Sequence, residues 1–387
     1  MGPFGSSIKA DNFVSSGVPV IRGANLNGTR LRETGYVYLT NEKADELRNA
    51  EARPGDIVIT HRGTLGQVVL IPRNSMYPRY IVSQSQLKLS LDETQALPEF
   101  VVYWLQSSVG QHALLSFAAQ TGVPALAQPL TSVRQLDIPL PPIEEQRSTA
   151  ATLGALDDKI ESNRRATCLL GNLAQACFAV WRERAVPIRA ETFGSFAEVF
   201  GGATPRTTEP TYWDGGLAWT TPTDVTRLAS PYLFSTSRTI SDAGLRSCTA
   251  VMHPTGTIFM TSRATIGAFA VNQIPASTNQ GFIAVRPRRS SDRWFLFEEM
   301  RSRIQEFLDN ANGSTFLEIS RGRFKELSLG VPTTDAINEL YSLLAPLHAK
   351  AAQLAKESTA LERLRKTLLP ELLSGRIRVS EAEEGIG

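Results

Sequence analysis

Two stretches far apart in the chain, GDIVITHRGTLG at residues 55–66 and GTIFMTSRATIG at residues 256–267, share the same residue at six of their twelve positions. The shared residues include two threonines, an arginine and two glycines at equal spacing, so one structural unit occurs twice. Within each stretch, β-branched and apolar residues flank a short polar turn, which predicts two strands joined by a hairpin. The sequence therefore indicates the internal duplication of a strand-rich unit.

Further matches extend the duplication on both sides. Residues 17–26 match residues 216–225, SQSQLKL from Ser83 matches STNQGFI from Ser277, and residues 122–141 match residues 313–332. Runs rich in Val, Ile, Thr and Phe, bounded by Gly and Pro, predict strands in both copies. We expect strands at 57–60, 67–71, 81–91, 257–261, 266–271 and 282–286, and short helices at 98–107 and 291–310.

A long helix is predicted after each copy, over residues 143–181 and 335–369. Apolar residues in both stretches recur alternately three and four positions apart, which is the heptad pattern of helices packed side by side. Pro370 is expected to end the second helix. Asn163 occupies a seam position, where a buried amide could fix the register of the pair or, alternatively, lie at its solvent edge. The expected seam consists of Leu153, Leu156, Ile160, Asn163, Leu170, Leu344, Leu347, Leu354, Leu361 and Leu368.

The composition is that of a globular protein of two or three domains. The chain has 387 residues, 42% of them hydrophobic and 20% charged, and a formal net charge of +2, which by itself implies no nucleic-acid partner. It has no apolar run of about eighteen residues, and its first residues lack the pattern of a signal peptide. Three cysteines are too few for a disulfide framework, and an odd number leaves one cysteine without a pair. We therefore expect a cytoplasmic protein without a membrane span.

The sequence contains no catalytic constellation. The phosphate-binding patterns GxxxxGK[ST] and GxGxxG are missing, and the four histidines are too far apart for a zinc site. No adenine-methyltransferase motif and no nuclease-like acidic cluster occurs either. The sequence therefore favours a binding protein over an enzyme and predicts neither a metal nor a cofactor.

Arg62 and Arg263 are the strongest polar candidates, because each lies at the same place in the repeated hairpin. One interpretation puts both arginines on DNA. Since two units that read different sequences would share them, phosphate contact is then favoured over base reading. The alternative is that each arginine donates to carbonyl groups of its own hairpin, and the sequence supports the two interpretations equally.

Beyond these patterns, the chain resembles the DNA specificity subunits of type I restriction–modification systems. The resemblance rests on IPLPPIEEQRSTAATLGALDDKIESNRRATCLLGNLAQACFAVW at 138–181, on GGATPRTTEPTYWDGGLAWTTPTDV at 201–225, on GDIVITHRGTLG and GSTFLEIS, and on LLPELLSGRIRV at 368–379. It covers nearly the whole chain, and the segment at 138–181 is quite specific.

The resemblance implies an α+β fold with two β-rich target recognition domains, each followed by a long helix. The two helices are expected to form an antiparallel coiled coil with a pseudo-two-fold internal repeat. The expected domains are a first target recognition domain at 1–142, a central helical spacer at 143–185, a second target recognition domain at 186–334, and a C-terminal helical spacer and tail at 335–387. The first domain is expected to lack its first strand, because residues 193–199 of the second copy would fall at or before Met1. A late start codon or a truncation would explain this equally.

The resemblance also implies a non-catalytic subunit. Each domain would read one half of a split site in double-stranded DNA, two methyltransferase (modification) subunits would dock on the helices, and restriction subunits could join them. S-adenosylmethionine and ATP are expected on these partners rather than on this chain. Two other interpretations stay open: a coiled-coil adaptor whose β-rich heads bind protein or glycan, and a divergent DNA-modifying enzyme. The candidate DNA-binding residues are Arg22, Arg62, Gln84, Gln86, Thr221, Thr223, Arg263, Asn279, Gln280, Arg321 and Arg323.

Overall fold

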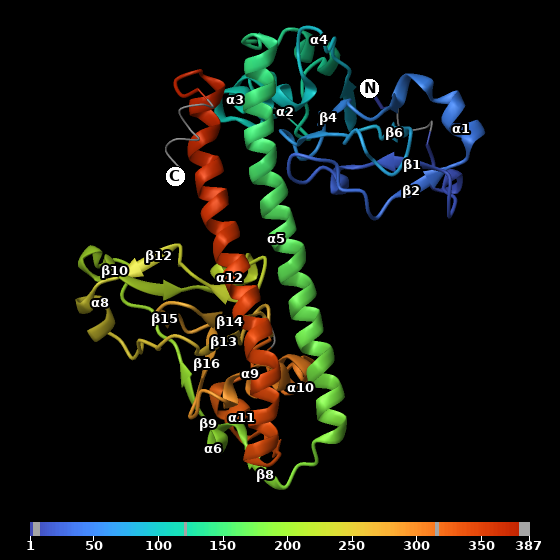
Figure 1. Cartoon of the computed structure of the whole chain (residues 1–387). Coiled ribbons are helices and arrows are strands. Elements are labelled where there is room, and N and C mark those ends of the chain that lie inside the picture. Colours follow the sequence, from blue (N-terminus) through green and yellow to red (C-terminus); the bar gives the residue numbers. More distant parts are fainter. Residues whose placement is uncertain (3–7, 120–121, 314–316, 379–387) are drawn as a thin grey trace. The chain divides into compact units, whose positions relative to one another are not determined.

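The computed structural model describes residues 1–2, 8–119, 122–313 and 317–378 (Figure 1). The chain divides into two units, one of Met1–Lys159 with Leu361–Gly387 and one of Ile160–Ala360. Residues 3–7, near the start of the expected first domain, and residues 379–387, at the end of the expected tail, lie outside the described residues. None of the described helices combines the length and the apolar character needed to span a membrane.

The first unit contains two small sheets. The first has the strand order β2 (Val37–Leu39), β1 (Val18–Ile21), β6 (Tyr80–Val82) and β3 (Glu51–Ala52). The second has the order β5 (Val68–Leu70), β4 (Ile57–Thr60) and β7 (Gln86–Leu89). β1 and β6 run parallel, whereas β4 is antiparallel to both of its neighbours, so the predicted hairpin is confirmed.

The second unit repeats this arrangement and adds strands. One sheet has the order β12 (Arg238–Ile240), β10 (Trp213–Thr220) and β15 (Ala276–Thr278), with β10 and β15 parallel. A five-stranded sheet has the order β11 (Tyr232–Leu233), β14 (Phe269–Asn272), β13 (Ile258–Thr261), β16 (Phe282–Pro287) and β9 (Ala197–Gly201). A separate pair is formed by β17 (Ser328–Val331) and β8 (Arg189–Thr192).

The hairpin strand lies between two cores in each unit. In β4, Ile57 and Ile59 enter the core that contains α2 and the long helices, while Val58 enters the core of the other sheet. In β13, Ile258 and Met260 likewise face one core and Phe259 faces the other. Because successive side chains of a strand point to opposite faces, burial on both sides explains why these strands read as continuous apolar runs.

The edge strand β9 has no counterpart among the described residues of the first unit. In the second unit β9 pairs with β16 from Ile283 to Pro287. In the first unit, β7 takes the place of β16, and the backbone N–H of Gly2 donates to the carbonyl of Gln86 at 2.8 Å.

Short helices lie at equivalent places in the two units. In the first unit the helices are α1 (Asn41–Glu46), α2 (Pro98–Gln106), α3 (Ser108–Leu115), α4 (Pro129–Arg134) and the start of α5 (Ile143–Arg184). In the second unit they are α6 (Phe193–Phe196), α7 (Pro222–Thr226), α8 (Asp242–Arg246), α9 (Asp292–Ser302), α10 (Ile304–Asp309), α11 (Arg321–Glu326) and the start of α12 (Thr334–Leu373). Single 3-10 turns lie at Ala10–Asn12, Gly23–Asn25, Arg48–Ala50 and Pro210–Tyr212.

The two predicted long helices are confirmed, but the end expected for the second one is wrong. α12 passes through Pro370, which is exposed and sits in the last turn, so only three helical residues follow the backbone N–H that proline lacks. The helix ends at a glycine cap instead. Gly375 has a φ of +68°, and the N–H of Arg376 donates to the carbonyl of Glu371 at 3.1 Å.

Part of α5 packs beside part of α12 in each unit. In the first unit Leu153, near the start of α5, shares a core with Leu368, near the end of α12. In the second unit Ala174 shares a core with Leu344, so the helices run antiparallel, as predicted. The ten residues of the expected seam are all buried or half-buried. Asn163 is 2% exposed, and its place at a solvent edge is therefore excluded.

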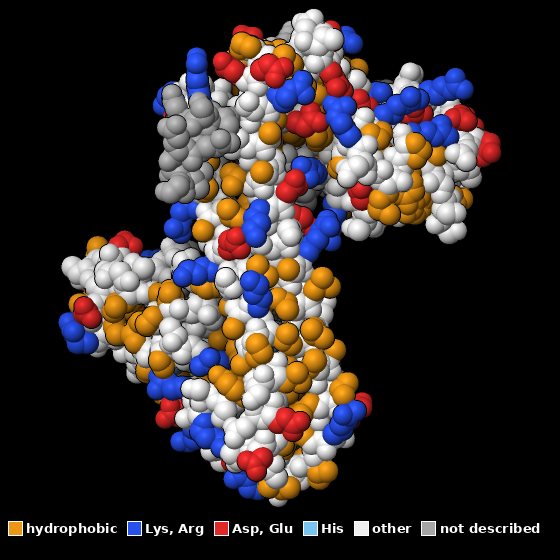
Figure 2. Space-filling view, in the orientation of Figure 1, with side chains coloured by type: hydrophobic (Ala, Val, Ile, Leu, Met, Phe, Trp, Pro, Cys, Tyr) orange, Lys and Arg blue, Asp and Glu red, His pale blue; other side chains and the backbone are white. Residues whose placement is uncertain are grey.

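The outer face of the helices in the second unit carries apolar side chains. Figure 2 shows such side chains gathered over the parts of α5 and α12 that belong to this unit. Leu169 is 68% exposed, Leu173 49% and Val180 50%, and all three lie on one face of α5 because they are spaced four and seven residues apart. Leu343 on α12 is 46% exposed.

Two predicted elements are each split in the structure. The strand expected at 81–91 is interrupted at Ser83, whose carbonyl accepts a turn hydrogen bond from the N–H of Gln86 at 3.0 Å. The helix expected at 291–310 breaks at Arg303 into α9 and α10. Neither break has a Gly or Pro to mark it, which is why the sequence pattern misses both.

Candidate nucleic-acid interface

Three strand ends meet at one corner of the first unit. β1 and β6 are parallel, with Ile21 beside Val82, so both strands end at the same edge. The N–H of Ser83 donates to the carbonyl of Ile21 at 3.0 Å. The N–H of His61, at the end of β4, donates to the carbonyl of Ser85 at 2.9 Å and joins the hairpin to this edge.

A pocket of about 400 Å³ opens at this corner. It is lined by all four candidate residues of the first unit, and these residues are Arg22, Arg62, Gln84 and Gln86. Thr60 at the end of β4 and Gln67 just before β5 also line it, and Thr60 donates to the side-chain oxygen of Gln67 at 3.1 Å. The structure thus gathers four candidate side chains that are up to 64 positions apart in the sequence.

The four candidates differ in the exposure of their polar atoms and in the hydrogen bonds that these atoms already make. Gln86 is 1% exposed, accepts from the Ser83 hydroxyl and donates to the Thr60 hydroxyl, so it is an internal residue of the corner. Gln84 is exposed. Nη2 of Arg22 donates to the carbonyl of Gly35 at 2.9 Å, and its Nε is buried without a hydrogen-bond partner in the part of the chain that the structure describes.

Arg62 sits at the tip of the hairpin, where a second loop is attached by backbone hydrogen bonds. Arg62 forms an isolated bridge with Ala125, and the N–H of Gly63 donates to the carbonyl of Pro124 at 2.8 Å. The Arg62 side chain is exposed and makes no hydrogen bond or ion pair with any described residue. The alternative in which Arg62 donates to carbonyls of its own hairpin therefore finds no such contact among the described residues.

The second unit builds the same corner. The N–H of Asn279 donates to the carbonyl of Thr220 at 3.0 Å, and the N–H of Ser262 donates to the carbonyl of Gly281 at 2.9 Å. Arg263 bridges Glu318, as Arg62 bridges Ala125. The Arg263 side chain is also exposed, with no hydrogen bond or ion pair to the residues that the structure describes.

The hairpin tips also share an unusual backbone conformation. Gly63 has a φ of +92°, and Ala264, at the equivalent place, has a φ of +60°. Alanine rarely adopts this left-handed conformation, so the shape of the tip is retained in the second unit without a glycine.

The backbone hydrogen bonds correct one sequence match. The sequence pairs Gln86 with Gln280, but the equivalent bonds of Ser83 and Asn279 pair Gln84 with Gln280. The match SQSQLKL to STNQGFI is therefore shifted by two residues, because polar residues recur at short intervals in both segments. Both Gln84 and Gln280 are exposed, and Arg22 occupies the place of Thr221.

Most candidates of the second unit lie at this corner. A Cβ built on Gly281 would lie 3.1 Å from the side-chain oxygen of Asn279 and 3.6 Å from Cγ of Arg263, so these two side chains flank one glycine. Gln280 accepts from the Thr204 hydroxyl. Thr221 caps α7 and donates to the Asp224 carboxylate at 2.7 Å, and Thr223 is exposed in the same turn.

Arg321 and Arg323 stand apart from this group. Arg321 is exposed at the start of α11, and its side chain lies within 4.0 Å of a Cβ built on Gly201. Arg323 donates through Nη2 and Nε to the Asn310 side-chain oxygen at 2.6 and 2.9 Å and lies 3.7 Å from Glu326. The guanidinium of Arg323 is therefore held within its own unit.

His61 belongs to the corner but was not a candidate. Its ring Nε2 lies 3.0 Å from the carbonyl of Gln84, which positions the backbone that carries the exposed amide. Burial lowers the pKa of His61, so the neutral ring is favoured. The sequence gives little signal for this role, since the second unit has Ser262 at the same place.

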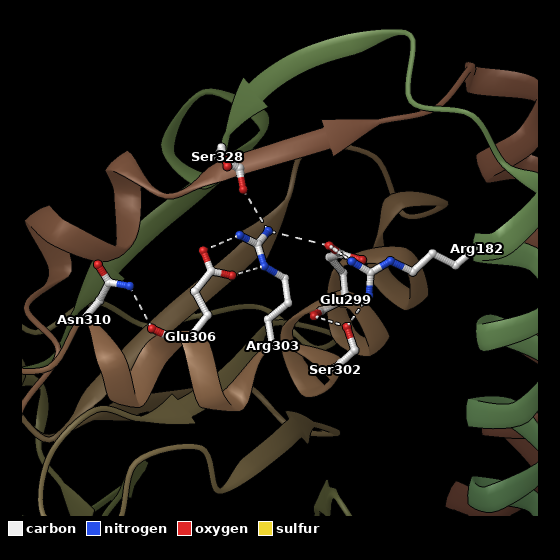
Figure 3. A network of polar contacts seen from close by, with 7 residues as sticks. All are labelled: Arg182, Glu299, Ser302, Arg303, Glu306, Asn310 and Ser328. Atoms are coloured by element: carbon white, nitrogen blue, oxygen red, sulfur yellow. Dashed lines mark hydrogen bonds and ion pairs between the residues drawn. The ribbon is translucent and has the colours of Figure 1, made fainter.

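Other arginines of the second unit are paired with acidic residues of that unit. Figure 3 shows Arg303 between Glu306, at 2.6 Å, and the carbonyl of Ser328, at 2.8 Å. Arg182, at the end of α5, donates to Glu299 at 3.3 Å, and burial raises the pKa of this glutamate. These cations are engaged in holding α5, α9 and α10 together. The described residues also contain no cluster of His, Cys, Asp or Glu suited to a metal ion.

Comparison with known proteins finds the same duplication. A family model described as the type I restriction modification DNA specificity domain matches residues 5–167 and again residues 191–363. The chain belongs to this family. The two matched stretches correspond to the two copies of the repeat, and each reaches into the long helix that follows.

Several relatives in this family are similar to the chain. The specificity subunit of the type I restriction enzyme MjaIX of Methanocaldococcus jannaschii is 31% identical over 169 residues, which cover 43% of this chain and only 39% of that subunit. The specificity subunit of HindI of Haemophilus influenzae is 22% identical over an alignment of 410 residues that covers 87% of each chain. The crystal structure of a type I S subunit from M. genitalium shares the fold, with a TM-score of 0.61 and 16% identity over 94% of this chain and 91% of that one.

Proposed function

We propose that this chain is the DNA-reading subunit of a type I restriction–modification complex. Each unit would place its strand-end corner on one half of a split duplex site. The single observation that carries this proposal is that the corner occurs twice, each time with an exposed arginine that is not bonded to a described residue, Arg62 or Arg263. Two equivalent cationic tips suit two segments of one polyanion.

The polar make-up of the corners supports DNA over a protein or glycan. Exposed arginine and glutamine side chains, such as Arg62 and Gln84, are donors that suit phosphates and base edges. Their attachment to strand ends through backbone hydrogen bonds holds them in place before binding, which limits the entropy lost on association.

In this proposal the chain itself is not catalytic. S-adenosylmethionine and ATP would be bound by partner subunits, and the chain would serve as their scaffold. The exposed apolar face formed by Leu169, Leu173 and Val180 on α5 suits a methyltransferase subunit, because a large exposed apolar patch commonly marks a protein interface. The internal repeat supports two such subunits, to which restriction subunits would add.

The test is binding of the full chain, purified with its methyltransferase subunits, to a library of randomised duplexes. We expect enrichment of a bipartite sequence with an unread spacer. The affinity for the enriched duplex should fall steeply with salt, with a slope of about −0.9 for each phosphate contacted. Retention of DNA without enrichment of any sequence, or retention that is insensitive to salt, would contradict the proposal.

A further inference from the structure

The two corners contain side chains that are common to both units and side chains that differ. Arg62 matches Arg263 and Gln84 matches Gln280, whereas Arg22 stands where the second unit has Thr221. Contact with a phosphate has the same chemistry at every sequence, while contact with a base edge depends on the base. The common side chains therefore suit the DNA backbone, and the differing position suits base reading.

We propose that Arg22 is a specificity-determining residue of the first unit and reads a guanine in the major groove of its half-site. This inference rests on the DNA-reading function proposed above. Arginine is the side chain best matched to guanine, because its planar fork can donate to O6 and N7 together.

The local geometry of Arg22 fits this role. The hydrogen bond from Nη2 to the carbonyl of Gly35, at 2.9 Å, holds the guanidinium in one orientation. Nε of Arg22 is buried, but no other acceptor among the described residues bonds to this guanidinium, so the N–H groups of Nη1 are left for a ligand. Arg22 also lines the pocket of about 400 Å³, together with the exposed side chains of Gln84 and Arg62.

The second unit cannot make this contact at the equivalent place. The Thr221 hydroxyl donates to the Asp224 carboxylate at 2.7 Å and accepts from the backbone N–H of the same residue at 3.4 Å. It is therefore engaged in capping α7 and carries no positive charge. The two half-sites should differ at the base pair that lies opposite these positions.

The internal repeat supplies the test variant, Arg22→Thr, which places the residue of the second unit in the first. The full chain is purified with its methyltransferase subunits and selected against randomised duplexes, beside the unaltered complex. We expect the first half-site to lose its preference for one G·C pair by roughly 5- to 140-fold, the fold-change that corresponds to one good arginine–guanine contact. The second half-site should be enriched as before, and this shows that the variant complex is folded.

Two further variants sharpen the result. Arg22→Lys keeps the charge but loses the planar fork, so it should lose the same base preference while keeping its affinity for unrelated DNA. Arg32→Thr removes an exposed arginine near the corner, whose Nε bonds to Thr34 and to no other described residue, and should leave both half-sites unchanged.

The outcomes separate this inference from the proposed function. If the unaltered complex enriches no sequence, the proposed function fails and the inference fails with it. If the unaltered complex enriches a bipartite site and Arg22→Thr enriches the same site, only the inference fails. An equal loss of affinity for all sequences in Arg22→Thr and Arg22→Lys would also overturn it, since it would make Arg22 a backbone contact.

Discussion

Nε of Arg365 on α12 lies 2.7 Å from Oδ1 of Asp157 on α5, and the two side chains are only 24% and 20% exposed. The other carboxylate oxygen of Asp157 accepts from the hydroxyls of Thr29 and Tyr103 at 2.8 and 2.9 Å. Nη2 of Arg365 also donates to Thr29 at 3.0 Å. One carboxylate thus joins both long helices to the globular part of the first unit.

This arrangement predicts a large effect for Asp157→Asn. The substitution removes the charge that compensates Arg365, and we expect a loss of about 1–3 kcal/mol in the free energy of unfolding of the first unit. The neighbouring Asp158→Asn is the matched control, because Asp158 pairs with Arg30 in the open, at 59% and 49% exposure. That variant should lose at most about 1 kcal/mol. Urea unfolding of the full chain measures both, and equal losses would contradict the prediction.

The second prediction concerns the loss of stability in acid that His253 should cause. Its ring lies 5.3 Å from that of Phe200 and 5.5 Å from that of Phe259, and neither ring nitrogen has a hydrogen-bond partner in the described structure. Burial, aided by the charge of Arg286, lowers the pKa of His253 from 6.5 to about 4. Between these two values the unfolded chain binds a proton that the folded chain does not, so stability falls as the pH falls through this window.

The loss on acidification should approach a few kcal/mol, at about 1.4 kcal/mol for each pH unit inside the window. Unfolding of His253→Phe, which keeps the aromatic packing, should depend less on pH between 6.5 and 4 than unfolding of the unaltered chain. His112 is exposed, so His112→Gln serves as the control and should keep the full dependence. Parallel pH profiles for His253→Phe and the unaltered chain would refute the role of His253.

The third prediction separates phosphate contact from structure at the hairpin tips. Arg62→Ala and Arg263→Ala should each weaken DNA binding to a similar degree for all sequences and make the salt slope shallower by about one unit. Both side chains are exposed and unbonded to described residues, so the thermal midpoint of each variant should stay unchanged. A lowered midpoint with an unchanged salt slope would make the arginines structural.

The fourth prediction tests the apolar face of α5. Leu169→Lys together with Leu173→Lys should abolish co-purification of the methyltransferase subunits proposed above as partners, because charge on an apolar patch opposes its burial. The stability of the chain alone should change little, since the two leucines are 68% and 49% exposed. Gln175→Lys, on another face of the same helix, is the control and should keep the partners bound. Normal co-purification of the double variant would place the partners elsewhere.

The sequence predicts well those features that have a repeated or periodic signal. The alternating spacing of apolar residues locates both long helices, and the repeated hairpin locates Arg62 and Arg263 at equivalent places. These signals survive because they depend on spacing within one continuous segment. The strand of the hairpin follows from the same kind of pattern.

The details of the corner depend on contacts between distant segments, which spacing alone does not encode. The pairing of Gln84 with Gln280 emerges only from backbone hydrogen bonds to other strands. Nothing in the sequence near Arg323 indicates a partner for its side chain, yet its guanidinium donates to Asn310. His61 supports the corner through a single carbonyl contact, and its counterpart in the second unit is a serine.

The division of the chain into units has a consequence for its synthesis. The core of the first unit contains Leu153 from α5 and also Leu368 and Leu372 from the end of α12. The segment that begins at Ile160 and ends at Ala360 forms the second unit, and the ribosome must make it before those leucines exist. At about 5–20 residues per second, these roughly 200 residues take on the order of 10–40 s. During that interval the core of the first unit lacks the leucines that α12 contributes. The part of the protein that is made first is therefore the last to be completed.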